Sequence, residues 1–372
     1  PSWVKEMIAA GHTSFYNEEG ECYDFIEGGY LDGSAETEAI TIEALRSTNK
    51  PVAENMSAAL HNMGDGVLLY EFNAKMNAID QDIVAMGFKA LEMLDNDDFD
   101  ALVIGNEGPN FCVGANVFGV LMAAQQGAWD QLDQMIKDLQ TLTYNLRYSP
   151  KPVVTAVHQQ ALGGGVEMAM AGWTAVADHE TYMGLVEVGV GLVPAGGGCM
   201  EMIRRKMNPT MSIQNGDPLP PMQKIFEQIA TAKVGTSAWE SKELGYLQDD
   251  DVINMNSELR LARAKEIALE LIRVDARPPE PEQVYAAGRD VQSALKLGLR
   301  SFVWGRYASE HDELIGQKLA HVLCGGNISG PTWVDPWYIL DLEREAFLSL
   351  LGEEKTQARI MHMLQKGKPL RN

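Results

Sequence analysis

The sequence predicts an α/β fold with a helical C-terminal region, and three observations lead to this prediction. Strand-like and helix-like apolar patterns alternate through the first three quarters of the chain. A β-rich run at residues 152–157 leads to three consecutive glycines, Gly163–Gly165, and a segment of helical composition comes next at 166–172. The prolines within 278–281 interrupt the chain, and most of the residues after 282 have helical periodicity.

Length and composition suggest the domain organisation. A chain of 372 residues predicts two domains, or one large domain with appendages. Residues 1–50 are polar, irregular and begin without methionine, so we interpret them as a linker or a remnant of a preceding domain. We expect a core over residues 51–277 and a helical region over residues 278–372.

Charge and cysteine content exclude several classes of function. The net charge of −22 argues against nucleic acid or an anionic membrane as partner, although an anionic small molecule needs only a local positive pocket. No run of about 18 apolar residues is present, so we expect no membrane span. The four cysteines form no CxxC pair, which favours free thiols in a reducing, cytoplasmic compartment and no metal site.

Local signals place the elements of the first half. Asp65-Gly66 between alternating apolar runs predicts a hairpin over 58–72. Apolar residues at helical spacing predict a helix over 79–93. A buried strand at 101–105 and a largely helical stretch at 117–148, with Gly127 as a break, complete the elements before the glycines.

The second half is expected to be mainly helical. The predicted elements up to the prolines are strands at 174–177 and 181–184, a glycine-rich loop at 188–198, a helix at 199–206, a proline-rich surface loop at 208–221, and helices at 222–233, from a capping box at Ser237, and at 259–272. Beyond them we expect helices at 284–298, 300–307, 311–324, 337–351 and 353–364.

Two turns are candidates for binding a ligand oxygen through backbone amides. The Gly163–Gly165 turn allows positive φ and leaves N–H groups unpaired at a helix start. The segment 110–116 also comes after a strand and precedes a helix. Two such turns can aim two N–H groups at one carbonyl oxygen, an oxyanion hole in which one donor is worth about 3 kcal/mol. Taken alone, each turn is more typical of a plain connection.

Glu167 and Glu187 are candidate acid and base groups. Packing of the strands around residues 174–184 against the glycine turn would bring both carboxyl groups, with their apolar neighbours, to one pocket. Two carboxyl groups in an apolar cleft have pKa values that move apart, so one can act as acid and the other as base. The alternative is that both are solvated or salt-bridged surface residues, which for a random pair is roughly nine times as frequent.

The sequence lacks the motifs that several other kinds of binding or catalytic site require. The sequence contains neither G-x-G-x-x-G nor GxxxxGK[ST], which argues against a dinucleotide site or a P-loop. It contains no G-x-S-x-G, and neither glycine-rich turn carries a serine nucleophile. His158, alone in a strand-to-turn segment, is more typical of a structural histidine than of a metal ligand.

Several segments together resemble the enoyl-CoA hydratase (crotonase) superfamily. The central block matches in order and spacing at 151–157, 161–169, 184–187 and 194–197, and further similarity lies at 76–78, 111–115 and 237–245. The resemblance implies a crotonase-like spiral of ββα units. It also implies amides of Ala115 and Gly164 around a thioester oxygen, and Glu167 and Glu187 flanking the C2=C3 bond of an enoyl-CoA. The residues implied to bind substrate are Ala78, Val113, Asn116, Val117 and Gly163.

The resemblance is closer to the hydratase half of bacterial fused enzymes of fatty-acid β-oxidation, in which a 3-hydroxyacyl-CoA dehydrogenase comes first. It extends to residues 3–7, 310–314, 323–326 and 367–372. It implies that NAD belongs only to the missing dehydrogenase portion. This chain would then need no cofactor, with coenzyme A entering as part of the substrate. Asn116, Phe118 and Ala74 depart from the common residues of the family, which leaves the CoA-phosphate contacts open.

These patterns lead to three hypotheses about function. The first is an enoyl-CoA hydratase that adds water syn to a 2-enoyl-CoA, with the dehydrogenase domain of the same polypeptide as partner and a homo-oligomer as one option. The second is a Δ3,Δ2-enoyl-CoA isomerase, although the presence of both glutamates favours hydration. The third is a non-catalytic scaffold for the dehydrogenase, for which the helical region after Pro281 is suited. Which glutamate is acid and which is base stays open.

Overall fold

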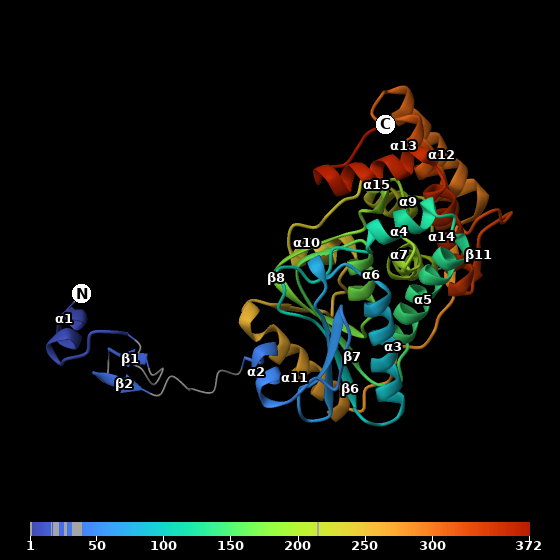
Figure 1. The fold of residues 1–372 in the computed structure, drawn as a ribbon. Helices are drawn as coiled ribbons and strands as arrows, with labels where there is room; N and C mark the ends of the chain where they lie inside the picture. The colour runs from blue at the N-terminus through green and yellow to red at the C-terminus, as the bar shows by residue number, and fades with distance from the viewer. Residues whose placement is uncertain (1, 16, 18–21, 26–27, 32–38, 214–215) are drawn as a thin grey trace. The chain divides into compact units, whose positions relative to one another are not determined.

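The computed structural model describes residues 2–15, 17, 22–25, 28–31, 39–213 and 216–372, and the chain divides into two compact units, Pro1–Ile40 and Thr41–Asn372 (Figure 1). The first unit contains the helix α1 (Ser2–Ala9) and the antiparallel strands β1 (Cys22–Asp24) and β2 (Gly29–Leu31). Aromatic rings hold it together, with Trp3 against Phe15 and Phe25. Residues 1, 16, 18–21, 26–27 and 32–38 of the predicted linker lie outside the described residues.

A seven-stranded mixed sheet organises the second unit. Its order is β3-β4-β5-β6-β7-β8-β9, with antiparallel pairing up to β5 and parallel pairing from β5 onward. The strands are β3 (Ala53–Glu54), β4 (Ala58–Asn62), β5 (Val67–Phe72), β6 (Ala101–Ile104), β7 (Val153–Leu162), β8 (Thr174–Gly184) and β9 (Val252–Asn254). The predicted hairpin is therefore confirmed as β4 and β5, with Asp65 and Gly66 both at positive φ in its turn.

Helices cover both faces of the sheet, because successive strand residues point to opposite sides. Figure 1 shows the sheet between α3 (Gln81–Asp95) and α11 (Arg260–Arg273). The residues facing α3 and α5 (Trp129–Arg147) belong to one large core that includes Leu68, Tyr70, Leu102 and Ile104. Their neighbours along the strands, such as Leu69 and Val103, are buried too, which makes these strands continuous apolar runs.

The remaining helices connect and surround the sheet. They are α2 (Ile42–Thr48), α4 (Val117–Gln125), α6 (Gly164–Met170), α7 (Gly198–Met202), α8 (Asn208–Met211), α9 (Leu219–Ala230) and α10 (Ala238–Leu244), with 3-10 turns at Lys75–Asn77, Glu187–Val190 and Ser257–Leu259. Gly127, at φ 72°, separates α4 from α5 as predicted. Across the described part of the chain, every helix is too short or too polar to cross a lipid bilayer.

The C-terminal region is helical, as predicted, apart from one small strand pair. Its helices are α12 (Gly288–Trp304), α13 (Glu310–Leu323), α14 (Pro336–Leu351) and α15 (Glu354–Lys366). The predicted helices 284–298 and 300–307 are wrong in detail, since residues 284–286 form β10, paired antiparallel with β11 (Thr332–Val334), and one helix comes after it. The periodicity cannot show that residues 332–334 supply hydrogen bonds to 284–286.

Two further predictions were wrong in a similar way. The predicted separate strands 174–177 and 181–184 are one strand, β8, although its pairing with β7 is interrupted between these two segments, at residues 178–180 opposite His158. The expected proline-rich loop 208–221 contains α8 and the start of α9, because Pro209 and Pro220 lie in the first turns of helices, where proline is tolerated. Residues 214–215 of that segment lie outside the described residues.

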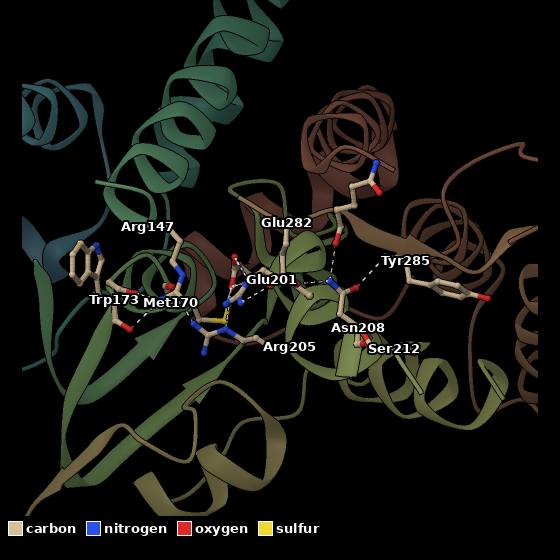
Figure 2. A network of polar contacts seen from close by, with 12 residues as sticks. Arg147, Met170, Trp173, Glu201, Arg205, Asn208, Ser212, Glu282 and Tyr285 are labelled. Carbon is tan, nitrogen blue, oxygen red and sulfur yellow. Dashed lines mark hydrogen bonds and ion pairs between the residues drawn. The ribbon is translucent and has the colours of Figure 1, made fainter. Parts of the chain in front are cut away.

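A buried ionic network joins α7 to its surroundings (Figure 2). Glu201 accepts hydrogen bonds from Arg204 and Arg205 in the π-helical turn Ile203–Met207. Burial raises the pKa of Glu201, but the two guanidinium groups outweigh it and lower the pKa to about 2. Arg205 also donates to the carbonyl of Met170 at the end of α6. The network therefore fixes α7 and α6 relative to each other.

Asn208 ties the segment after the prolines to the core (Figure 2). Its Nδ2 donates to the carbonyl of Gln283 at 2.8 Å and to Glu282, and its Oδ1 accepts from the N–H of Tyr285 at 3.1 Å. The C-terminal region is thus attached close to the end of α7.

Candidate active site

The glycine turn between β7 and α6 brings two loops into direct contact. Gly163 has φ 53° and ψ −123°, a conformation suited to glycine. A Cβ atom on Gly165 would lie 2.1 Å from the carbonyl oxygen of Cys112. A Cβ atom on Gly163 would lie 2.7 Å from Oε1 of Glu187. Both positions therefore require glycine, for contact with the neighbouring turn and with a carboxyl group.

The segment 110–116 is held against this turn on two sides. The N–H of Leu162 donates to the carbonyl of Cys112 at 2.9 Å. On the other side, Ile79 donates to the carbonyl of Gly114 and accepts from the N–H of Asn116, both at 2.8 Å. The N–H of Ala115, between these anchors, donates to no backbone oxygen of the described residues.

The amides of Ala115 and Gly164 lie next to each other. A Cβ atom on Gly164 would be 3.5 Å from the nitrogen of Ala115, and one on Gly114 would be 3.6 Å from the nitrogen of Gly164. Gly164 is the first residue of α6, so its N–H has no partner within the helix. Within the described chain, the structure thus supplies two neighbouring unpaired donors at a helix N-terminus, which favours a negatively charged oxygen.

Glu167 lies in the first turn of α6 and is buried, with 4% exposure. Its Oε1 accepts hydrogen bonds from the N–H groups of Gly196 at 2.7 Å and Gly198 at 2.8 Å. Burial raises the pKa of Glu167 to about 7, although these two bonds favour the ionised form and oppose the shift. The group can therefore change its protonation state near neutral pH.

Glu187 begins the 3-10 turn Glu187–Val190, and its side chain lies over Gly163. The residue as a whole is partly exposed, but its Oε2 is buried without a hydrogen-bond partner in the described chain. Burial raises the pKa of Glu187 well above its ordinary value, and the charge on Glu167 raises it further. The carboxyl group of Glu167 and Oε2 of Glu187 are thus withdrawn from water, which excludes the alternative of two solvated surface glutamates.

The other residues expected at the substrate lie on two segments joined beside this pair. Ala78 comes directly after the turn Lys75–Asn77, and the N–H of Val113 donates to the carbonyl of Met76 at 3.4 Å. Asn116 caps α4, its Oδ1 accepting from the N–H of Gly119, and Val117 is the first residue of that helix. With Gly163, all nine predicted site residues are brought to one region, and their roles remain predictions.

Sequence reasoning missed a third buried carboxyl group, that of Glu343 on α14. It has 0% exposure, and it accepts from the N–H of Gly197 at 2.9 Å and of Met200 at 2.8 Å. Its position on the buried face of α14, between Leu340 and Phe347, was a signal that could have identified it. Its partners lie 146 and 143 residues earlier, and no local pattern indicates them.

Two hollows formed by described residues lie in this part of the molecule. A cavity of about 10 Å³ behind Glu167, between α5 and the 196–197 loop, has room for about one water molecule. A larger hollow of about 560 Å³ beside residues 73–77 is lined by Glu43, Glu71 and Glu107 with Arg46, a charge pattern unsuited to phosphates.

His158 has the structural role that its isolated position in the sequence favours. Its Nε2–H donates a hydrogen bond of 2.8 Å to the carbonyl of Gly108. Burial lowers its pKa to about 4, so the ring is neutral at physiological pH.

Comparisons with known proteins show similarity to enzymes that act on CoA thioesters. The sequence model of a family described as "Enoyl-CoA hydratase/isomerase" matches residues 62–210. A Bacillus subtilis protein named "Probable 3-hydroxyacyl-CoA dehydrogenase" is 42% identical over 373 residues, which cover 100% of this chain and 46% of the relative. The cyclohexa-1,5-dienecarbonyl-CoA hydratase of Thauera aromatica is 32% identical over 127 residues, covering 34% of this chain and 46% of the relative. The chain therefore spans about half the length of the curated relatives it matches.

Solved structures share the fold. The enoyl-CoA hydratase of Bacillus halodurans has a TM-score of 0.52 at 15% identity, covering 82% of this chain and 99% of that one. An enoyl-CoA hydratase/isomerase of Mycobacterium paratuberculosis has a TM-score of 0.54 at 17% identity, covering 82% and 98%. The predicted fold class, a crotonase-like α/β fold with a helical C-terminal region, is confirmed.

Proposed function

A family model described as "Enoyl-CoA hydratase/isomerase" matches residues 62–210, and from this similarity we propose that the chain is an enoyl-CoA hydratase. The reaction is the syn addition of water across the C2=C3 bond of a 2-enoyl-CoA. One observation carries the proposal: the backbone amides of Ala115 and Gly164, which have no partner among the described residues, lie beside the carboxyl groups of Glu167 and Glu187.

The two amides would hold the thioester oxygen. When water attacks C3, negative charge moves through C2 to that oxygen, and the intermediate resembles an enolate. Preformed N–H donors at the start of α6 stabilise this charge without reorganisation, and each is worth roughly 100- to 1000-fold in rate. The same donors would polarise the enoyl thioester before the attack.

The two glutamates would divide the proton transfers. Glu167 accepts two backbone hydrogen bonds that favour its ionised form, whereas Oε2 of Glu187 has no donor among the described residues and its pKa is raised further. We therefore assign Glu167 as the base that takes a proton from water and Glu187 as the acid that protonates C2. The hydroxyl group of the water bonds to C3, and the proton of Glu187 bonds to C2. A proton then passes from Glu167 to Glu187, which restores the starting protonation states.

Hydration of crotonyl-CoA, measured as loss of the ultraviolet absorbance of the conjugated thioester, tests the proposal. Glu167→Gln and Glu187→Gln are each expected to lower kcat by roughly 100- to 10,000-fold, because each removes a proton-transfer group. Glu180→Gln, an exposed glutamate on β8, is the matched control and should retain the rate. Full activity of both site variants would contradict the assignment.

The same assay separates the two other functions. A 3-enoyl-CoA that isomerises faster than a 2-enoyl-CoA hydrates would identify an isomerase. A wild-type chain that binds acyl-CoA poorly and converts neither substrate would identify a non-catalytic domain.

We also propose a 3-hydroxyacyl-CoA dehydrogenase domain in the same polypeptide, and thereby a place in fatty-acid β-oxidation. The support is the Bacillus subtilis relative, which bears that name and of which this chain covers 46%. The chemistry is continuous, since a hydratase produces the 3-hydroxyacyl thioester that such a dehydrogenase oxidises. A full-length protein should reduce NAD when given a 2-enoyl-CoA. The division of this chain into a core over 51–277 and a helical region over 278–372 remains part of the proposal.

A further inference from the structure

Two carboxyl groups from different parts of the chain hold the loop 195–200 through alternating amides. Glu167 on α6 accepts from the N–H groups of Gly196 and Gly198 at 2.7 and 2.8 Å. Glu343 on α14 accepts from Gly197 and Met200 at 2.9 and 2.8 Å, one oxygen for each amide. Gly197, whose amide binds Glu343, therefore lies in the sequence between Gly196 and Gly198, whose amides bind Glu167.

The conformation of this loop depends on its partners. Gly197 has φ 107°, and a Cβ atom on Gly196 would lie 2.3 Å from Oε2 of Glu167. On the other side, Thr143 of α5 donates to the carbonyl of Gly196 at 3.0 Å. A loop built from three consecutive glycines has little conformational preference of its own. Its side-chain partners must therefore determine where the amides of Gly196 and Gly198 point.

α14 supports the loop with more than Glu343. Gln140 of α5 donates to the carbonyls of Ala195 and Leu340, both at 2.8 Å, so it connects the loop to the α14 backbone. Arg344 donates to the Oε1 of Gln140 at 3.0 Å and fixes that amide. The C-terminal region thus reaches the predicted catalytic centre through one turn of α14.

We propose that Glu343 is a positioning residue for Glu167, which it orients through the amides of the loop 195–200. The inference rests on the proposed function, because it assigns Glu343 to the same hydration site. Its consequence is that the helical region after the prolines completes the site. Glu343 itself need not touch the substrate.

The charges around Glu343 are compatible with this role. Glu167 on α6 raises the pKa of Glu343, and Glu343 raises the pKa of the Cys199 thiol on α7. The neighbouring Arg344 forms ion pairs with Asp133 and Asp341 instead. Burial, and then the charge on Glu167, raise the pKa of Glu343 well above its ordinary value. The shift favours the neutral form of Glu343, although the N–H donors of Gly197 and Met200 oppose it, and the glutamine of Glu343→Gln is neutral as well.

The test compares Glu343→Gln, Glu343→Asp and Glu345→Gln, the last being an exposed glutamate on the same helix. A glutamine places an NH₂ group against one of the two amide donors, so one hydrogen bond is lost. We expect kcat for crotonyl-CoA to fall by roughly 10- to 100-fold in Glu343→Gln with KM nearly unchanged, as for a small misplacement of a catalytic group. Glu343→Asp, which keeps both acceptor oxygens, should be intermediate, and Glu345→Gln should match the wild type.

Two readouts separate positioning from loss of folded protein. In Glu343→Gln the acidic limb of the pH profile should move to higher pH, because the amides of Gly196 and Gly198 then stabilise ionised Glu167 less. Hydrogen exchange of residues 196–200 should accelerate in Glu343→Gln and stay unchanged in Glu345→Gln. A wild-type pH profile, with activity reduced only in proportion to the folded fraction, would overturn the proposal.

Failure of the proposed function would appear elsewhere. A wild-type chain that converts no enoyl-CoA, while exchange at residues 196–200 still depends on Glu343, would reject the hydratase and leave the hydrogen bonds to the loop established. An active wild type with unchanged kcat and exchange in Glu343→Gln would reject only the role of Glu343.

Discussion

Replacing Gly165 by alanine would force apart the two turns that carry the Ala115 and Gly164 amides. The added Cβ would lie 2.1 Å from the carbonyl oxygen of Cys112, 2.9 Å from its carbonyl carbon and 3.0 Å from its Cβ. Ordinary contact begins at 3.4 Å, so the turns must separate by roughly the 1.3 Å difference. The obstacle is backbone on both sides, and no side-chain rotation relieves it.

The expected effect is larger on catalysis than on stability. Overpacking of this kind costs about 1–3 kcal/mol of the free energy of unfolding. A displacement of about 1 Å in a catalytic group, or loss of one oxyanion donor, lowers the rate by roughly 100-fold or more. We therefore expect Gly165→Ala to fold, with kcat for crotonyl-CoA reduced at least 100-fold and the two glutamates intact.

Gly298→Ala is the control for this experiment. Gly298 lies in α12, and a Cβ atom there meets nothing within 4 Å. Alanine at an unobstructed helical position should leave kcat unchanged and raise stability by about 0.5–1 kcal/mol. A Gly165→Ala variant that is folded by circular dichroism and retains the wild-type kcat would refute the argument that close contact of the two turns creates the site.

Two further predictions concern buried charges. The folded-state pKa of Glu167, about 7 against an ordinary 4.5, means that its ionisation opposes folding as pH rises through this range. Glu167→Gln should therefore have a higher Tm than the wild type at pH 8, with the difference vanishing near pH 4.5, and an equal Tm at both pH values would contradict the burial argument. Arg260 is buried and paired with Asp178. Arg260→Ala should lower the free energy of unfolding, measured in urea, by about 3–5 kcal/mol, because Asp178 is then left buried without its charged partner. Arg263→Ala, which breaks the exposed pair with Glu266, should lower the free energy of unfolding by at most about 1 kcal/mol. Equal losses in the two variants would refute the distinction between buried and exposed pairs.

The sequence by itself predicted those features whose causes are local. Asp65-Gly66 identified the hairpin, and the helical spacing of apolar residues identified the helix that the structure places at Gln81–Asp95. The glycines at 163–165 indicated a turn with positive φ before a helix, and the φ of 53° at Gly163 confirms this. Packing of the strands around residues 174–184 against the glycine turn predicted that Glu167 and Glu187, 20 positions apart, share a pocket, and the family resemblance added their expected place at the C2=C3 bond.

The tertiary structure decided what depends on partners far along the chain. Residues 174–184 continue as one strand, β8, through the interruption of its pairing with β7, and the pairing with residues 332–334 makes a strand of 284–286 where periodicity predicted a helix. Glu343 appears in the sequence only as one acidic residue on an apolar helix face, and its two amide partners are more than 140 residues away. Turn and helix signals arise from the backbone preferences of neighbouring residues and can be read locally. The pKa values of the three buried carboxyl groups and the direction of the loop amides arise from burial and packing, which only the folded chain determines.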